Sequence, residues 1–465
     1  MNIAMLLEMA ADGLGSRVAF GSRDGGLTYG ALRDAATGVA AHLAGTPQTV
    51  AVLGETAPLV PVALFGAAWA GVSYAPLNYR LPDEAREALL ARLAPAVVAE
   101  PAWVDLPADP GRAFPDAPAT PAVLLFTSGT SAAPKAAQLG HDQLTAYVLN
   151  TVEFGAAADD EAVLVAVPPF HIAGVAAVLS STYAGRRIVP LPRFDPHEWL
   201  GLARREAVTH AFVVPTMLAR IVAVMADDPD ARVPALRHLA YGGSRMPAPV
   251  LEQALALLPD TEFVNAYGLT ETSSTVCLLG PDDHRRAHAS EDPAEQARLA
   301  SVGRPVPGVE VRVVDGEIWV RGDQVAGEYL DTESQRDGDG WLHTGDRGSV
   351  DADGYVFVEG RGDDVIIRGG ENVSPAEVED TLLRHPAVAG AAVVGVPDPE
   401  WGERIGAMVV RRRGAALDVD ELRAFVRDRV GSLKTPELVI VRDELPHTAT
   451  GKVLRRAVRT ELRDA

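Results

Sequence analysis

Short apolar runs alternate with helix-like segments along the first half of the chain. Val50–Leu53 and Val123–Phe126 have the length and composition of strands that are buried on both faces of a parallel sheet. Three later runs have the same character: Ala211–Val214, His238–Tyr241 and Glu262–Val264. Between them, apolar residues recur every three or four positions, which indicates amphipathic helices. This alternation predicts an α/β fold built of βαβ units.

The pattern changes from about residue 309 onward. Val309–Val314, Glu317–Val320 and Tyr355–Glu359 are short alternating segments between glycine turns, as in a small antiparallel β subdomain. The sequence GRGDD at 360–364 is typical of a linker. We therefore predict two domains, with residues 1–360 forming a large N-terminal α/β domain that includes the β subdomain, and residues 361–465 forming a small α+β domain.

The second domain has its own element signals. Ser374-Pro375-Ala376-Glu377 has the form of a capping box with proline at the first helical position, which predicts a helix start. The strands expected after it are Ala387–Val396, Ile405–Val410 and Leu438–Val441, with a helix around Leu422–Val430. In the first domain, Pro101–Pro121 is rich in proline and alanine and is expected to be a surface connection.

Composition excludes several classes of function. The 42 basic and 63 acidic residues give a net charge of −21, which argues against a nucleic-acid partner and against an anionic membrane surface. A single cysteine, Cys277, excludes an internal disulfide and a multi-cysteine metal site. No apolar run reaches transmembrane length, and Met1–Gly13 lacks the basic segment of a secretory signal. We expect a cytoplasmic globular protein with no membrane span.

Lysine is rare in this chain. Of the 42 basic residues only Lys135, Lys434 and Lys452 are lysines, and arginine is otherwise the default cation. Against that background a lysine is expected mainly where a compact charge on a flexible stem is needed.

One segment combines hydroxyl groups, glycine and a lysine directly after a predicted buried strand. Residues 126–135 read FTSGTSAAPK, so backbone N–H groups and hydroxyls can surround phosphate oxygens while Lys135 neutralises them. The spacing is not that of a Walker loop. By itself, a polar loop of this kind is more often only a loop.

Four further motifs follow in order: YGLTE at 267–271, TGD at 344–346, GRGDD at 360–364 and PHTATGK at 446–452. Together with the loop, they resemble the adenylate-forming superfamily, which includes acyl-CoA synthetases, peptide-synthetase adenylation domains and luciferases. The resemblance covers nearly the whole chain. It implies a mobile C-terminal domain, with Asp363 at the hinge, and a reaction that uses ATP, Mg²⁺ and coenzyme A.

The resemblance also implies roles for individual residues. Lys452 would stabilise charge between the carboxylate and the α-phosphate, Glu271 would bind Mg²⁺, and Thr270 would touch the α-phosphate. Asp346 would accept hydrogen bonds from the ribose hydroxyls and Arg361 would donate to them. The full set of expected nucleotide contacts is Thr127, Ser128, Gly129, Thr130, Lys135, Gly242, Gly243, Ser244, Asn265, Ala266, Tyr267, Gly268, Thr270, Asp346 and Arg361.

The segment PPFHIAG at 168–174 resembles the lining of the acyl pocket in acyl-CoA synthetases, where a histidine flanks the reacting carboxylate; His171 is therefore a further catalytic candidate. No aspartate stands between Phe170 and Gly174, which argues against an amino-acid substrate. Small or apolar walls favour an uncharged fatty, alicyclic or aromatic acid, although Arg220 or Arg245 could bind a second carboxylate. The wall candidates are Phe170, His171, Val175, Gly243, Gly268, Ser273, Ser274 and Cys277.

The sequence does not distinguish between the possible acceptors of the acyl group. Gly369 and Gly370 resemble the segment that meets pantetheine, an arm that coenzyme A and an acyl carrier protein share. Two alternatives to an acid–CoA ligase are a stand-alone adenylation enzyme that loads a carrier protein or another nucleophile, and a catalytically silent acyl or nucleotide sensor. The loop departs from the family at Ala132 and Ala136, where glycine is usual, which affects flexibility but removes no ligand.

Overall fold

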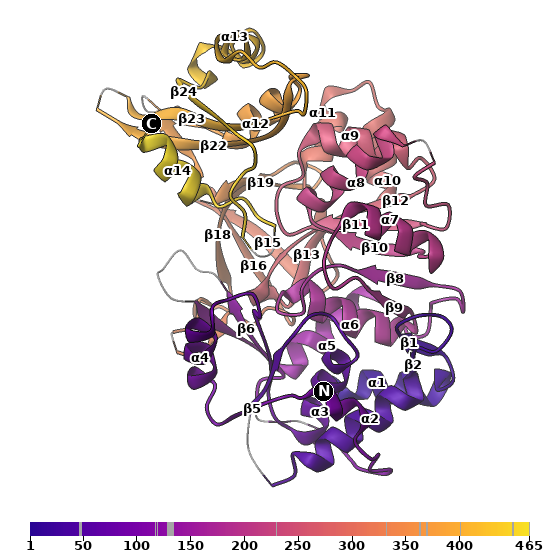
Figure 1. Cartoon of the computed structure of the whole chain (residues 1–465). Coiled ribbons are helices and arrows are strands. Elements are labelled where there is room, and N and C mark those ends of the chain that lie inside the picture. Colours follow the sequence, from indigo (N-terminus) through magenta and orange to yellow (C-terminus); the bar gives the residue numbers. More distant parts are fainter. Residues whose placement is uncertain are drawn as a thin grey trace.

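A computed structural model describes residues 1–45, 49–116, 118, 120–127, 134–228, 230–331, 333–361, 364–368, 371–399, 401–448 and 451–464. Figure 1 shows a large body formed by the N-terminal part of the chain and a smaller C-terminal body above it. Helices flank sheets throughout, so the α/β prediction is confirmed.

A mixed sheet forms one half of the large body. Its strands are Val18–Phe20 (β1), Leu27–Thr28 (β2), Ala162–Val165 (β8), Arg187–Pro190 (β9), His210–Val213 (β10), His238–Gly242 (β11), Glu262–Leu269 (β12), Ser274–Leu279 (β13) and Arg304–Pro305 (β14). They lie in the order β14, β13, β12, β11, β10, β8, β9, β1, β2. Strands β8 to β12 pair in parallel, and β13 turns back antiparallel to β12. The apolar runs predicted at 211–214, 238–241 and 262–264 are thus confirmed as neighbouring parallel strands.

A second sheet carries the hydroxyl-rich segment. Its strands are Thr49–Leu53 (β3), Tyr74–Leu77 (β4), Ala96–Val98 (β5), Val123–Thr127 (β6), Lys135–Leu139 (β7) and Glu328–Tyr329 (β17), in the order β17, β7, β6, β4, β3, β5. Strands β3 to β6 are parallel, whereas β7 runs antiparallel to β6 with Thr127 opposite Lys135. The sequence pattern did not predict this hairpin, which brings the two ends of the hydroxyl-rich segment together.

Two smaller sheets complete the molecule. The strands Val309–Val314 (β15), Glu317–Gly322 (β16), Leu342–Val350 (β18) and Val356–Arg361 (β19) form the predicted antiparallel subdomain. The C-terminal sheet contains Ile366–Arg368 (β20), Glu371–Val373 (β21), Val388–Asp398 (β22), Gly402–Arg411 (β23) and Leu438–Arg442 (β24). Separate apolar clusters on its two faces pack against helices, so the C-terminal domain has its own core.

Helices cover both large sheets. In the N-terminal body they are Ala4–Leu14 (α1), Tyr29–His42 (α2), Leu59–Ala70 (α3), Asp83–Arg92 (α4), His141–Thr151 (α5), Ile172–Ala184 (α6), Pro196–Arg205 (α7), Pro215–Asp227 (α8), Ala248–Leu257 (α9), Pro281–Ala289 (α10) and Pro293–Gln296 (α11). The C-terminal domain adds Pro375–Leu383 (α12), Val419–Val430 (α13) and Arg455–Arg463 (α14). None of the helices in the described part of the chain combines the length and apolarity needed to cross a bilayer.

Two local predictions need correction. Ser374 is the N-cap of α12 and Pro375 its first residue, but the Ser374 side chain makes no capping hydrogen bond, and Glu377 pairs with Lys434 Nζ at 2.7 Å instead of closing a capping box. The stretch 101–121 is not only a surface connection, because its first part forms a short 3₁₀ helix, Pro101–Asp105, and buries Trp103 in the core. In both cases a long-range contact outweighs the local pattern.

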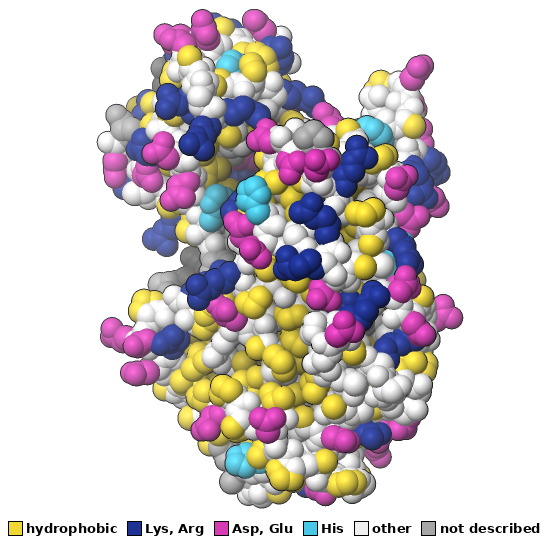
Figure 2. Space-filling model, turned by 45° about the vertical axis from the view of Figure 1, so that its right-hand side comes forward, with side chains coloured by type: hydrophobic (Ala, Val, Ile, Leu, Met, Phe, Trp, Pro, Cys, Tyr) yellow, Lys and Arg dark blue, Asp and Glu magenta, His cyan; other side chains and the backbone are white. Residues whose placement is uncertain are grey.

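The surface charge is mixed where it is visible. Figure 2 shows acidic and basic side chains interspersed over the upper half of one face, while hydrophobic side chains gather on the lower, N-terminal half.

Candidate functional site

Asp346 is held by two donors from different parts of the chain. It is buried in strand β18, where its Oδ2 accepts a hydrogen bond from the Tyr267 hydroxyl at 2.6 Å and its Oδ1 lies 2.8 Å from Arg361 Nε. Burial raises the pKa of Asp346, and Arg361 and Tyr267 oppose this shift by stabilising the charged form. A carboxylate has about four lone-pair sites, so both oxygens retain acceptor capacity for ligand hydroxyls.

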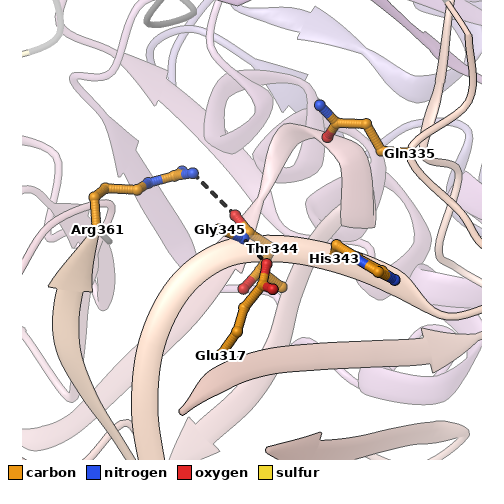
Figure 3. A pocket seen from close by; sticks show the side chains of 6 residues that line it. All are labelled: Glu317, Gln335, His343, Thr344, Gly345 and Arg361. Carbon is orange, nitrogen blue, oxygen red and sulfur yellow. Dashed lines mark hydrogen bonds between the residues drawn. The ribbon is translucent and has the colours of Figure 1, made fainter. Parts of the chain in front are cut away.

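The turn that precedes Asp346 is fixed by its backbone. Gly345 has a φ of +71° and its N–H donates to Glu317 Oε1 at 2.9 Å, while Arg361 donates to the Thr344 carbonyl at 2.9 Å. These groups line a pocket of about 360 Å³ beside Asp346 (Figure 3), whose walls are Glu317, Gln335, His343, Thr344, Gly345 and Arg361. Its lining combines polar groups with apolar atoms and is open to solvent, so a ligand that carries hydroxyl groups can enter it.

Glu271 lies at the end of β12, in a short 3₁₀ turn, Thr270–Thr272. Its Oε1 accepts a hydrogen bond from the Tyr329 hydroxyl at 2.5 Å. Burial and the neighbouring Glu271 carboxylate raise the pKa of Tyr329, so the phenol stays protonated and acts as the donor. Among the described residues none donates to the other oxygen of Glu271, which leaves it for a ligand.

Lys452, from the C-terminal domain, lies near Asp346 and Glu271. Its ammonium interacts electrostatically with Arg361, Asp346 and Glu271. Arg361, predicted as the first residue of the second domain, is the last residue of β19 in the four-stranded sheet; Asp346 lies in β18 and Glu271 in the turn after β12. Lys452 is exposed at the surface. Partial desolvation by neighbouring protein atoms and the charge of Arg361 lower its pKa, while Asp346 and Glu271 raise it. Lys452 therefore lies within electrostatic reach of these three residues.

Contacts between the domains fix this arrangement. The Thr216 hydroxyl in α8 donates to the carbonyl of Gly451 at 3.3 Å, directly before Lys452. Helix α12 lies against α9, where Asp380 accepts from Arg245 Nη1 at 3.1 Å, pairs with Nη2, and accepts from a backbone N–H of α9 at 3.3 Å. Arg384 pairs with Glu252 at 2.9 Å on the same interface.

His171 is both a helix cap and a neighbour of the site. It is the N-cap of α6, where its Nδ1 accepts from the Ala173 N–H at 3.2 Å. Burial lowers the pKa of His171 to about 4, and the positive charge of Lys452 contributes, so the ring is neutral at physiological pH. Beside it, the ring of Phe170 packs edge-on against Tyr79 at 5.8 Å.

The residues expected around the adenine lie at the end of β11, directly after it, and within β12. Gly242 is buried where the two strands approach closely, since an added Cβ would stand 2.2 Å from the Ala266 carbonyl oxygen. Gly243 has a φ of +82°, and the nearest atom to an added Cβ is Val214 Cγ1 at 3.7 Å, so space lies beside it. The side-chain amide of Asn265 donates a hydrogen bond to the Ser301 carbonyl at 3.0 Å, so this N–H group already has a partner within the protein.

The remaining wall candidates differ in exposure. Val175, Ser273 and Cys277 are buried, and Cys277 belongs to the apolar cluster between β13 and the four-stranded sheet. Ser273 and Ser274 both have positive φ, at +54° and +116°, so the chain after Glu271 turns sharply. Gly268 packs against that turn, because an added Cβ would stand 1.7 Å from the Ser274 carbonyl oxygen.

Several expected residues lie outside the described part of the chain: Ser128, Gly129, Thr130, Asp363, Gly369 and Gly370. Of the loop, Thr127 and Lys135 are described, and they face each other across β6 and β7. Glu317 and Tyr329 were not predicted from the sequence, although both contact site residues. Their only local signals are short strands, and their partners lie 28 and 58 positions away.

The donor set fits one magnesium ion shared with a phosphate ligand. The described residues contain no cluster of three or more acidic, histidine or cysteine side chains able to hold a metal ion alone. Mg²⁺ characteristically takes one or two carboxylates and completes its shell with phosphate oxygens and water. Glu271, with one oxygen available, and Lys135 and Lys452 as cations suit such a shared site.

Two family models match the chain. The model of the AMP-binding enzyme matches residues 7–113 and 95–330, and that of the AMP-binding enzyme C-terminal domain matches residues 377–452. A feruloyl-CoA synthase of Amycolatopsis sp is 36% identical over 451 residues, covering 88% of each chain. A fatty acid–[acyl-carrier-protein] ligase, ScoC of Streptomyces coeruleorubidus, is 36% identical over 366 residues, covering 74% of this chain and 67% of the relative.

A solved structure extends the likeness to the whole fold. The O-succinylbenzoate coenzyme A synthetase (MenE) of Bacillus subtilis, in complex with ATP and a magnesium ion, superposes with a TM-score of 0.82 at 28% identity. The superposition covers 98% of this chain and 99% of that protein. The likeness therefore includes both the N-terminal body and the C-terminal domain.

Proposed function

Because this chain belongs to the AMP-binding enzyme family, we propose that it activates a carboxylic acid with ATP and then transfers the acyl group to coenzyme A. One observation supports the proposal most strongly: Lys452 of the C-terminal domain lies close enough to Asp346 and Glu271 of the N-terminal body for their charges to shift its pKa. A catalytically silent sensor would only bind its ligand, so it would not need a second domain to bring a cation to the nucleotide site.

In the first half-reaction the carboxylate oxygen attacks the α-phosphorus of ATP and the bond to pyrophosphate breaks, which gives an acyl adenylate. Asp346 and Arg361 hold the ribose, and Lys452 supplies positive charge beside the attacked phosphate. Glu271 would hold Mg²⁺, which would supply positive charge to the phosphates. Lys135 adds a second cation at the opening of the β6–β7 hairpin.

In the second half-reaction the thiol sulfur of the acceptor attacks the acyl carbon, AMP leaves, and the thiol proton passes to solvent. The bond between the acyl carbon and the phosphate oxygen breaks and its electron pair leaves with AMP, but the α-phosphorus itself is not attacked. We therefore expect this step to proceed without Lys452. The two half-reactions therefore place different demands on the C-terminal domain, with Asp363 as the proposed hinge.

An uncharged acid is the favoured substrate class. Arg245 is engaged with Asp380, and the guanidinium of Arg220 lies 5.1 Å from the ring centroid of Phe194 on an exposed part of α8. Both arginines therefore already have partners within the protein, which argues against their binding a second carboxylate of the substrate. His171 is neutral and stands at the N-terminus of α6, which suits contact with a reacting carboxylate without a permanent charge.

Coenzyme A is proposed as the acceptor because the feruloyl-CoA relative covers more of the chain than the carrier-protein ligase does. The carrier-protein relative keeps the alternative acceptor as a second candidate. Both acceptors present the same pantetheine thiol, so the first half-reaction is common to them.

Isotope exchange between pyrophosphate and ATP tests the proposal. A panel of fatty, alicyclic and aromatic acids should contain members that stimulate exchange in the wild-type protein, and mass spectrometry with coenzyme A or holo carrier proteins should then identify the thioester. Nucleotide binding with exchange that no acid stimulates would instead support the silent sensor.

A further inference from the structure

Tyr329 lies between two site residues of opposite charge. It is 6% exposed, its hydroxyl donates to Glu271 Oε1 at 2.5 Å, and its ring centroid lies 5.3 Å from Lys135 Nζ. An ammonium at this distance over an aromatic face is attracted by the ring quadrupole. One side chain thus contacts both the carboxylate and one of the cations expected at the phosphates.

The backbone holds Tyr329 in this position from two sides. Strand β17 pairs with β7, and Gln138 donates from its side chain to the Tyr329 carbonyl at 2.7 Å. On the other side, the Ala326 N–H donates to the backbone carbonyl of Glu271 at 2.8 Å. The segment that carries the tyrosine is therefore bonded both to the strand that begins with Lys135 and to Glu271.

The hydroxyl has a second polar neighbour. It lies 3.1 Å from Gln335 Oε1, but a phenol has one proton, and the shorter bond to a carboxylate is the stronger one. Gln335 also lines the pocket in Figure 3, so the tyrosine hydroxyl contacts a side chain of the pocket wall. The bond to Glu271 fixes one carboxylate oxygen and directs the other away from the tyrosine.

We propose that Tyr329 is a positioning residue for the metal-bound triphosphate: its hydroxyl orients Glu271 toward the metal ion, and its ring seats the ammonium of Lys135. This inference rests on the proposed function. Hydrogen-bond partners behind a metal ligand typically change metal affinity by about 10- to 100-fold when they are removed. The two parts of the side chain should therefore have separable effects.

Two substitutions separate the hydroxyl from the ring. Tyr329→Phe removes the bond to Glu271 and keeps the aromatic face, whereas Tyr329→Leu removes both. Tyr355→Phe is the matched control, because Tyr355 is also buried and its hydroxyl donates at 2.7 Å to a carboxylate, that of Asp283 in α10. Glu271→Gln provides the reference for loss of the proposed metal ligand itself.

The readout is binding of Mn²⁺ to the protein–ATP complex, followed by electron paramagnetic resonance with no acid present, so turnover is not measured. Tyr329→Phe should weaken Mn²⁺ binding about 10-fold and leave metal-free ATP affinity unchanged. Tyr329→Leu should weaken metal-free ATP binding as well, and Tyr355→Phe should alter neither. Thermal melting of each variant confirms that it is folded.

Three results would overturn the inference in distinguishable ways. Mn²⁺ affinity in Tyr329→Phe equal to that of the wild type, with weakened binding in Glu271→Gln, would mean that the tyrosine does not orient the ligand. Unchanged binding in Glu271→Gln would remove the metal assignment of the proposed function, and the role of the tyrosine with it. Equal effects of Tyr329→Phe and Tyr355→Phe would indicate general destabilisation.

Discussion

The ion pair between Arg245 and Asp380 should control how often Lys452 occupies the site. Asp380 accepts three hydrogen bonds, two from Arg245 and one from a backbone N–H, and only 17% of its side chain is exposed. Arg245→Ala removes the paired cation from this largely desolvated carboxylate. Because the Arg245 side chain is 34% exposed, the cost lies between that of a surface pair and that of a fully buried one, about 1–2 kcal/mol.

A change of about 1–2 kcal/mol alters an equilibrium roughly 5- to 30-fold. We expect Arg245→Ala to slow acid-dependent ATP–pyrophosphate exchange by this factor, since undocking removes Lys452 from the α-phosphate. Exchange at increasing KCl concentration should also fall more steeply in the wild type than in the variant, because salt screens the intact pair.

The neighbouring pair on the same interface is the control. Arg384 and Glu252 have side chains that are 49% and 46% exposed, so Arg384→Ala should cost less than about 1 kcal/mol. Exchanging the charges, with Arg245→Asp and Asp380→Arg together, should restore part of the activity lost in Arg245→Ala. Wild-type exchange in Arg245→Ala, or a larger loss in Arg384→Ala, would refute the reasoning.

Three other outcomes are expected. Lys452→Ala should lower adenylation by at least about 10²- to 10³-fold and spare thioester formation from a pre-made acyl adenylate; Lys452→Arg should also fail substantially, and intact exchange in both variants would remove the catalytic assignment. Gly243→Trp should block acid binding in titrations while ATP still binds, with Gly243→Ala as the control for the strain of a side chain at φ +82°; unchanged acid affinity would show that Gly243 does not line the pocket. Burial lowers the pKa of His141 to about 4, so between pH 6.5 and 4 the unfolded state binds more protons and the free energy of unfolding falls as the pH falls. His141→Asn, which can still accept from the Ile3 N–H, should make urea unfolding less pH-dependent over this range, and an unchanged slope would contradict the assignment.

Local patterns predicted those elements whose stability depends on their own burial. Val309–Val314 was predicted with the bounds that β15 has, and the run at 238–241 lies within β11. The pattern failed where a distant partner decides the structure. The two-residue strand β17 forms only because β7 offers a free edge, and Trp103 is buried because α2 and α3 pack over it.

The site shows the same division. Motif spacing singled out Asp346, Glu271 and Lys452, and the structure places their charges within reach of one another. Motif spacing did not predict Glu317, whose carboxylate accepts a hydrogen bond from the backbone N–H of Gly345 on a neighbouring strand. A contact of this kind depends on strand register, which the motifs do not encode.

The pairing of β17 with β7 also has a consequence for the order in which the protein folds during synthesis. Gln138 and Tyr329 are 191 positions apart, so β7 is translated long before its partner strand leaves the ribosome. Until then β7 is an edge strand with unpaired backbone groups, the type of surface that invites pairing with other chains. A chain that stops before Glu328 therefore lacks both the strand that covers this edge and the tyrosine beside Glu271, and the nucleotide site is completed only after this late contact has formed.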